Sequence, residues 1–131
     1  MRSVALAVLV VLCALPAVAG DEGPNTGRVI LEVCQTAVAV MDNPRGIYSA
    51  DEAMNAGQCI GNINGFFDFY HVGLTAGWIA GTARFCAPNG ATNEQYLRIV
   101  VKYLKANPEK LHQNGTWLIY QALREAFPCP A

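Results

Sequence analysis

The sequence has few of the residues that carry catalytic or metal chemistry. It contains only two histidines, His71 and His112, no Cys-x-x-Cys pair and no His-Glu-x-x-His motif, so the ligand spacings of zinc sites are absent. It also lacks a basic run for nucleic acid and an acidic tail for a basic partner, and its formal net charge is −1. We therefore expect no metal, no cofactor and no nucleic-acid partner.

Long apolar runs are also missing. The run Val4–Leu15 has about a dozen residues, against the roughly 20 that a membrane-spanning helix needs. With Arg2 before it and a small-x-small site after it, the run predicts a secretory signal peptide that is cleaved between Ala19 and Gly20. The alternatives are a membrane anchor, which is disfavoured by the short run, and a lipoprotein.

Lipidation would use Cys13, but this cysteine follows a leucine and lies within the apolar run, so we favour the signal peptide. The expected organisation is a signal peptide over residues 1–19, a flexible leader over 20–27 and one helical domain over 28–131.

The cysteines are even in number once the expected signal peptide is removed. Four cysteines remain once the signal peptide is removed: Cys34, Cys59, Cys86 and Cys129. An even number in an exported chain is typical of two disulfides, and three pairings are open. Bonded cysteines cannot act as nucleophiles, so a cysteine enzyme is not expected.

Two amphipathic helical patterns lie between Cys86 and Cys129. Thr92-x-x-Gln95 is a capping box at the first start, and Asn107-Pro108-Glu109 predicts the second start. The apolar positions at helical spacing are Tyr96, Ile99, Val100, Tyr103 and Leu104, then Leu111, Leu118, Ile119, Ala122, Leu123 and Ala126. A tight corner near Asn107 would make an antiparallel hairpin. Its open ends would bring Cys86 to Cys129, which leaves Cys34 for Cys59.

The N-terminal half predicts two more helices. The first follows the apolar pattern from Val29 to Met41 and ends before Pro44, and the second begins at the capping box Ser49-x-x-Glu52. Along the second lie Gly57, Gly61 and Gly65, four residues apart, and after a break at Phe69 the spacing repeats with Gly73, Gly77 and Gly81. We attribute this glycine row to close approach of a neighbouring helix.

Three conformations stay open for residues 72–84: a continuation of the second helix, a separate short helix, or irregular loop. The predicted fold is all-α, a small disulfide-linked bundle of four helices, or five if residues 72–84 form one.

The aromatic stretch that begins at Phe66 admits a core and a surface interpretation. A membrane span is disfavoured, because Asp68 and His71 interrupt it. We interpret its aromatic residues as core in preference to an exposed patch: Phe66, Phe67, Phe69 and Tyr70. Asp68 is interpreted as a solvated residue.

Several short motifs from Cys59 onward stand in an order that resembles one protein family. They are Cys59-x-Gly61 with Gly65, Phe85-Cys86-x-Pro88, Gln95 with Val100-Val101-x-Tyr103-Leu104, Asn107-Pro108-Glu109-x-Leu111-His112, and Ala122-Leu123-x-x-Ala126-Phe127-Pro128-Cys129. In these motifs the chain resembles the Rap/Tai immunity proteins of bacterial type VI secretion. The resemblance implies a small, exported, all-helical protein that binds a toxic effector, commonly a peptidoglycan amidase, and blocks it in the periplasm. It implies no enzyme activity.

The contacts of that family are made by surface loops that vary, so no motif assigns them here. We expect specificity in residues 66–84, which are richer in aromatics than the family pattern, or in the loops at 42–48 and 87–91. The candidate partner-binding residues are Phe66, Asp68, Tyr70, His71, Trp78, Pro88 and Asn89. A homodimer is a further partner class.

Two other classes compete with an immunity protein. One is a periplasmic stress or acid-resistance protein, chaperone-like and without a cognate toxin. The other is an exported hydrolase, which the missing nucleophile and metal set disfavour. An adjacent toxin gene would support immunity, and a stress-regulated locus would support the chaperone.

Overall fold

The computed structural model describes residue 23 and residues 25–130 of the chain. Over these residues the secondary structure is four α-helices and two short 3-10 helices, without a strand: α1 (Gly27–Asp42), α2 (Ala50–Thr75), η1 (Gly81–Ala83), α3 (Asn93–Ala106), η2 (Pro108–Lys110) and α4 (Gly115–Ala126). The predicted small all-α bundle is confirmed. The expected signal peptide, with its cleavage between Ala19 and Gly20, lies outside the described residues.

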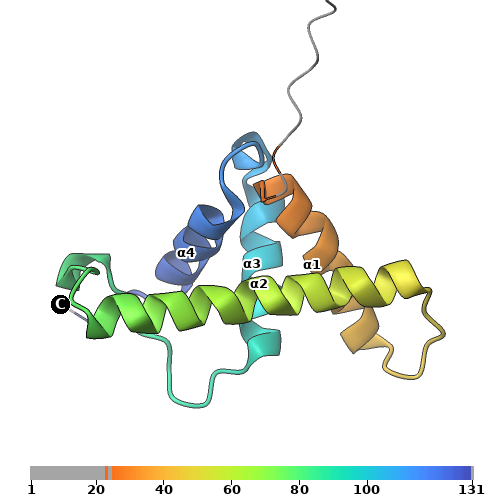
Figure 1. The fold of residues 1–131 in the computed structure, drawn as a ribbon, viewed down its shortest axis with the longest axis horizontal. Helices are drawn as coiled ribbons and strands as arrows, with labels where there is room; N and C mark the ends of the chain where they lie inside the picture. The colour runs from red at the N-terminus through yellow and green to blue at the C-terminus, as the bar shows by residue number, and fades with distance from the viewer. Residues whose placement is uncertain (1–22, 24, 131) are drawn as a thin grey trace, which may run out of the picture.

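Helix α2 is the longest helix and crosses the other three, which gather along one side of it (Figure 1). α1 packs most extensively on α2 and also contacts α3, and α4 runs back alongside α3. All four helices contribute fully buried side chains to one core: Ile30, Ile63, Leu97, Val100, Leu104, Leu118, Ile119 and Leu123. The apolar stripes predicted for the last two helices mark the inward faces of α3 and α4, except that Ala126 is exposed and Leu111 lies before the start of α4.

Both ends of α2 are set by local signals. At its start, the Ser49 hydroxyl accepts from the Glu52 amide (3.2 Å), and the Glu52 carboxylate accepts from the Ser49 amide (2.8 Å), so the capping box is complete. The helix ends at Thr75, and η1 follows within a loop. Residues 72–84 thus combine the end of a helix, a loop and a short 3-10 turn, and no single one of the three expected conformations describes them.

The start of α4 differs from the sequence prediction. The chain forms the short η2 after Asn107, and α4 begins only at Gly115, with the Asn114 side chain accepting from the Trp117 amide (3.0 Å). The reason is tertiary: the carbonyls of Leu111 and Gln113 accept from the first amides of α1, Arg28 (3.0 Å) and Gly27 (2.9 Å). These carbonyls accept hydrogen bonds from α1 and not from amides of their own helix. The predicted continuous helix from Pro108 is therefore wrong.

The two disulfides are Cys34–Cys59, between α1 and α2, and Cys86–Cys129, at the open end of the α3–α4 hairpin. This is the pairing that the helical hairpin favours in the sequence. Cys34 and Cys59 are fully buried, whereas Cys86 is exposed at the surface. The Cys34–Cys59 bridge therefore lies inside the core, and the Cys86–Cys129 bridge joins the two open ends of the hairpin beside the core.

The explanation offered for the glycine row, the approach of a neighbouring helix, is wrong. A Cβ atom on Gly57, Gly61 or Gly65 would meet nothing within 4 Å, so no neighbouring helix approaches there. At Gly73 a Cβ atom would meet only Ile79 of the loop after α2, and at Gly77 and Gly81 it would meet nothing within 4 Å. The close approach occurs instead where α1 and α4 begin: a Cβ on Gly115 would lie 2.4 Å from Cγ1 of Ile30. Among residues 23 and 25–130, no helix has the length and apolar character to cross a membrane.

Candidate partner-binding site

The seven candidate residues lie in three segments around the C-terminal half of α2. Asp68, His71, Trp78, Pro88 and Asn89 are exposed, whereas Phe66 and Tyr70 are buried at 7% and 5% exposure. The exposed residues separate into two grooves, one on each side of Tyr70.

A stack of aromatic rings separates the grooves. The Tyr70 ring stacks on Phe85 with a centroid distance of 4.4 Å, and the Tyr70 hydroxyl accepts a buried hydrogen bond from the Phe85 amide (2.9 Å). The core interpretation of the aromatic stretch is right for Phe66 and Tyr70 and wrong for Phe69, which is 63% exposed. Phe69 lies about 100° around the helix from Tyr70, so it cannot share the inward face.

The first groove, named here the polar groove, has a volume of about 800 Å³ and lies between α2 and the loop over residues 86–91. Five of the candidate residues line it: Asp68, Tyr70, His71, Pro88 and Asn89. At one end, the Asn93 side chain donates to the Asn64 side chain (2.8 Å) and links the start of α3 to α2. Residues about 20 positions apart in the sequence thus converge on one surface.

A tight turn forms the outer edge of the polar groove. The Ala91 amide donates to the Pro88 carbonyl (3.2 Å), and Gly90 has a φ of 89°, which is the left-handed position that a type II turn requires of its third residue. The loop between η1 and α3 projects beyond α2 (Figure 1). Its base is fixed by the Cys86–Cys129 bridge and by the Cys86 amide, which donates to the Phe127 carbonyl (2.8 Å).

The second groove, named here the aromatic groove, has a volume of about 550 Å³. It runs between α2, the loop after α2 and the start of α4, and its lining includes Phe69, Trp78, Ile79, Ala83, Trp117 and Tyr120. Both tryptophans of the chain are therefore in this groove, 70% and 49% exposed.

Sequence reasoning placed Trp78 among the candidates but missed Phe69, Trp117 and Tyr120. A signal was present for the last two. Trp117 and Tyr120 stand three positions apart, so they share a helix face, and both fall outside the buried stripe that contains Leu118, Ala122 and others.

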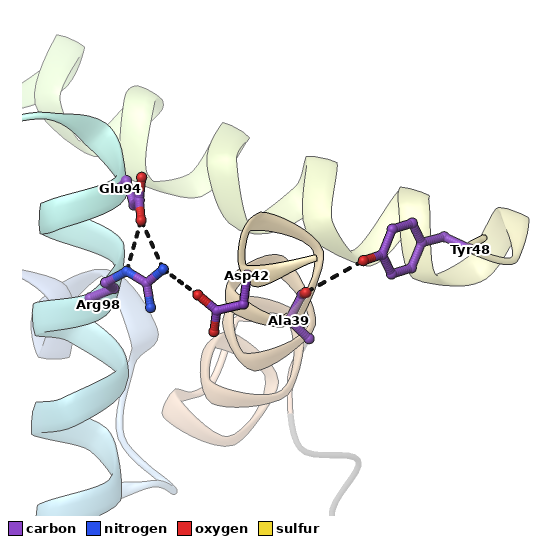
Figure 2. Close-up of polar contacts among 5 residues, drawn as sticks. All are labelled: Ala39, Asp42, Tyr48, Glu94 and Arg98. Atoms are coloured by element: carbon purple, nitrogen blue, oxygen red, sulfur yellow. Dashed lines mark hydrogen bonds and ion pairs between the residues drawn. The ribbon is translucent and has the colours of Figure 1, made fainter. Parts of the chain in front are cut away.

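The loop after α1, the other predicted place for specificity, is held by polar contacts (Figure 2). Arg98 on α3 donates to the Asp42 carboxylate at 2.5 Å and to Glu94 at 2.8 Å, and the hydrogen bond to Asp42 is the main cause that raises the pKa of Arg98. The Tyr48 hydroxyl donates to the carbonyls of Ala39 (3.5 Å) and Asn43. This loop lines neither groove.

The two grooves differ in the chemistry of their side chains. Within the part of the chain that the structure describes, no three His, Cys, Asp or Glu residues come together as a metal site. The polar groove offers a carboxylate, an imidazole and an amide from Asp68, His71 and Asn89, and the aromatic groove offers apolar rings.

Comparison with known proteins gives one family. The family model described as Rap1a immunity proteins matches residues 26–129, a range that contains α1 to α4 and both disulfides. Neither a curated protein nor a solved structure matches the chain significantly.

Proposed function

The chain belongs to the Rap1a immunity protein family, and from that premise we propose that it binds a cognate secreted toxin and inhibits it by occluding the active site. The family implies a toxin partner and suggests a non-enzymatic role. In our proposal the toxin is a peptidoglycan amidase delivered by type VI secretion, and this chain is no enzyme itself.

The proposed compartment is the periplasm, which the chain reaches through the signal peptide expected over residues 1–19. Two disulfides suggest an oxidising compartment, because thiols stay reduced in the cytosol. An amidase that cleaves peptidoglycan would meet its inhibitor in that same compartment.

The polar groove and its turn are the observation that supports occlusion. An enzyme cleft admits a narrow, projecting segment, and the turn at Pro88–Ala91 is projecting and anchored at its base. A loop that is already ordered loses less conformational entropy on binding than a flexible one. Asp68 and His71, which line the same groove, would contact the rim of the cleft.

The test is periplasmic co-expression with the candidate toxin of the neighbouring gene, followed by sizing chromatography of the complex. The double variant Asp68→Ala, Asn89→Ala should weaken the complex by at least about 10-fold, because it removes one polar contact of the inserted turn and one at the rim of the toxin's cleft. The matched control is Asp51→Ala, Gln58→Ala, which removes a carboxylate and an amide from exposed positions on the N-terminal half of α2. Killing that continues with the wild-type chain at equal expression, without a complex on the column, would overturn the proposal.

One observation favours the chaperone-like alternative: the aromatic groove exposes apolar surface of the kind that could hold an unfolded client. That function requires the chain to suppress aggregation of a denatured model protein at acidic pH and to show no partner toxin. Protection from a toxin without suppression of aggregation would exclude it.

A further inference from the structure

The aromatic groove is not used by the turn-based occlusion proposed above. Single exposed apolar residues are ordinary on protein surfaces, but a cluster of large ones marks a binding site. Phe69, Trp78 and Trp117 come from three different segments and line one groove with little polar surface. Aromatic residues of this kind carry much of the binding energy at protein interfaces.

The wall that contains Trp78 is held by the end of α2. Gly77 has a φ of 73°, and its amide donates to the Leu74 carbonyl (3.2 Å), while the Trp78 amide donates to the Gly73 carbonyl (2.9 Å). These two bonds make a Schellman motif, which fixes the direction of the chain as it leaves the helix. Ile79 then folds back onto Gly73, where a Cβ atom would lie 2.8 Å from Cδ1 of Ile79. Trp78 therefore projects from an ordered backbone.

The opposite wall is held in the same way. The rings of Trp117 and Tyr120 stack with a centroid distance of 5.1 Å, and the Tyr120 hydroxyl donates to the Ala83 carbonyl (3.0 Å). This bond ties α4 to η1 across the end of the groove. Both tryptophans thus stand on supported walls, and the space between them does not depend on a flexible loop.

Beyond Tyr120, a smaller hollow that carries two arginines adjoins the aromatic groove. The Arg124 guanidinium donates to the Thr82 carbonyl (3.2 Å) and to the Tyr120 hydroxyl (3.4 Å), and Arg84 lines the same adjoining hollow of about 300 Å³. Over residues 25–130, neither arginine is within ion-pair distance of a carboxylate. A ligand with a carboxylate in this hollow would be favoured by charge.

The apolar area decides between a segment and a whole protein surface. At 63%, 70% and 49% exposure, Phe69, Trp78 and Trp117 present about 400 Å², taking roughly 150–250 Å² for each aromatic residue. A stable dimer buries about 800 Å² of total surface on each partner, roughly 460 Å² of it apolar. The three exposed rings fall short of that area and line a concave groove, so the groove suits an inserted segment better than the surface of a second copy.

We propose that the aromatic groove binds an apolar segment of the toxin that carries acidic residues at one end. The apolar side chains insert between Trp78 and Trp117, and the carboxylates pair with Arg84 and Arg124. The inference rests on the proposed function in one respect: that function names the toxin as the protein that carries the segment. The apolar and acidic character of the segment follows from the groove itself.

The chain supplies its own reporter, because its two tryptophans both line the aromatic groove. The experiment titrates the purified chain with a short synthetic peptide that has a Leu-Leu-Phe-Leu centre and two acidic residues at one end. Saturable binding should shift tryptophan emission to shorter wavelength as water leaves the indoles. A peptide with two lysines in place of the acidic residues should bind about 10-fold more weakly.

Two variants keep both tryptophans and locate the effect. Phe69→Ala should weaken peptide binding by about 10-fold, whereas the control Met54→Ala, on the same helix and as exposed, should not change it. Arg84→Gln with Arg124→Gln should abolish the difference between the two peptides. No saturable shift, equal affinity for both peptides, or a dimer that Phe69→Ala dissociates would each overturn the inference.

The peptide titration contains no toxin, so it fails or succeeds independently of the proposed function. Loss of peptide binding alongside intact protection from the toxin overturns only the inference. The inference is also overturned if the peptide binds the groove but the Phe69→Ala variant still binds the toxin as tightly as the wild type, because the segment would then not belong to the toxin.

Discussion

Tyr70 acts in the core and at the surface at once. Its ring stacks on Phe66 and Phe85, its hydroxyl holds the Phe85 amide, and its edges line both grooves. Phe85 directly precedes Cys86, so this one hydrogen bond fixes the chain just before the projecting loop. A buried amide that loses its acceptor keeps the full cost of its desolvation.

We predict that Tyr70→Phe lowers the free energy of unfolding by about 1–3 kcal/mol, because the buried Phe85 amide is left without an acceptor. Urea unfolding measures the change. The control is Tyr96→Phe: Tyr96 also packs among aromatic rings, but its hydroxyl makes no hydrogen bond to any residue in the described part of the chain. Equal losses in the two variants would contradict the role of the hydrogen bond.

At the scale of the element, α2 carries the candidate site, and its two ends are specified by different devices. The capping box of Ser49 and Glu52 fixes its start, and the Schellman motif at Gly77 fixes its end and aims Trp78. Its outer face, with Gly57, Gly61 and Gly65, lies in open space. The helix thus depends on its caps and on its inward face, because its glycines weaken it by roughly 1 kcal/mol each relative to alanine.

The capping box predicts a pH dependence of stability. The pKa of Glu52 is lowered below its ordinary value of 4.5, mainly by the hydrogen bond from the Ser49 amide and next by the one from the Ser49 hydroxyl. A lowered pKa in the folded state stabilises the fold above the ordinary pKa, and this contribution is lost as the pH falls through the lowered value. Glu52→Gln should remove this part of the acid sensitivity in urea unfolding between neutral and acidic pH. An unchanged pH profile in the variant would contradict it.

At the scale of the whole molecule, the two disulfides have different surroundings. Cys34 and Cys59 are at 0% exposure between α1 and α2, whereas Cys86 is exposed beside the polar groove. Exchange with a thiol requires access to a sulfur, so the outer bridge is the accessible one. After reduction, the two segments would still be held together by the hydrogen bond from the Cys86 amide to the Phe127 carbonyl and by the backbone β-bridge between Phe85 and Pro128.

Mild reduction should therefore open Cys86–Cys129 first and leave Cys34–Cys59 intact while the helices persist. In the chain-entropy model the loss of the outer bridge, which closes a separation of 43 residues, costs about 4 kcal/mol. Alkylation followed by peptide mass mapping identifies the reduced pair, and circular dichroism follows the helices. Alkylation of Cys34 and Cys59 before the outer pair would contradict the prediction.

The sequence by itself determined what depends on near neighbours. Caps at Ser49 and Thr92 and the stop before Pro44 placed helix boundaries, and the apolar periodicity of the last two helices chose their buried faces. The ordered motifs from Cys59 to Cys129 indicated the family that the match over residues 26–129 shows. The caps and the periodicity depend on residues close together in the sequence, and the family motifs are a pattern of residue types along it. Both can therefore be recognised without coordinates.

Only the tertiary structure decided what depends on segments distant in the sequence. Helix α4 starts at Gly115 because the carbonyls before it accept hydrogen bonds from α1. Asp68 and Asn89 line one groove because the aromatic stack holds the loop beside α2. Likewise Trp117 faces Trp78 only because α4 packs against the loop that follows α2. Packing over long sequence separations sets these relations, and helical periodicity carries no information about which exposed faces will meet.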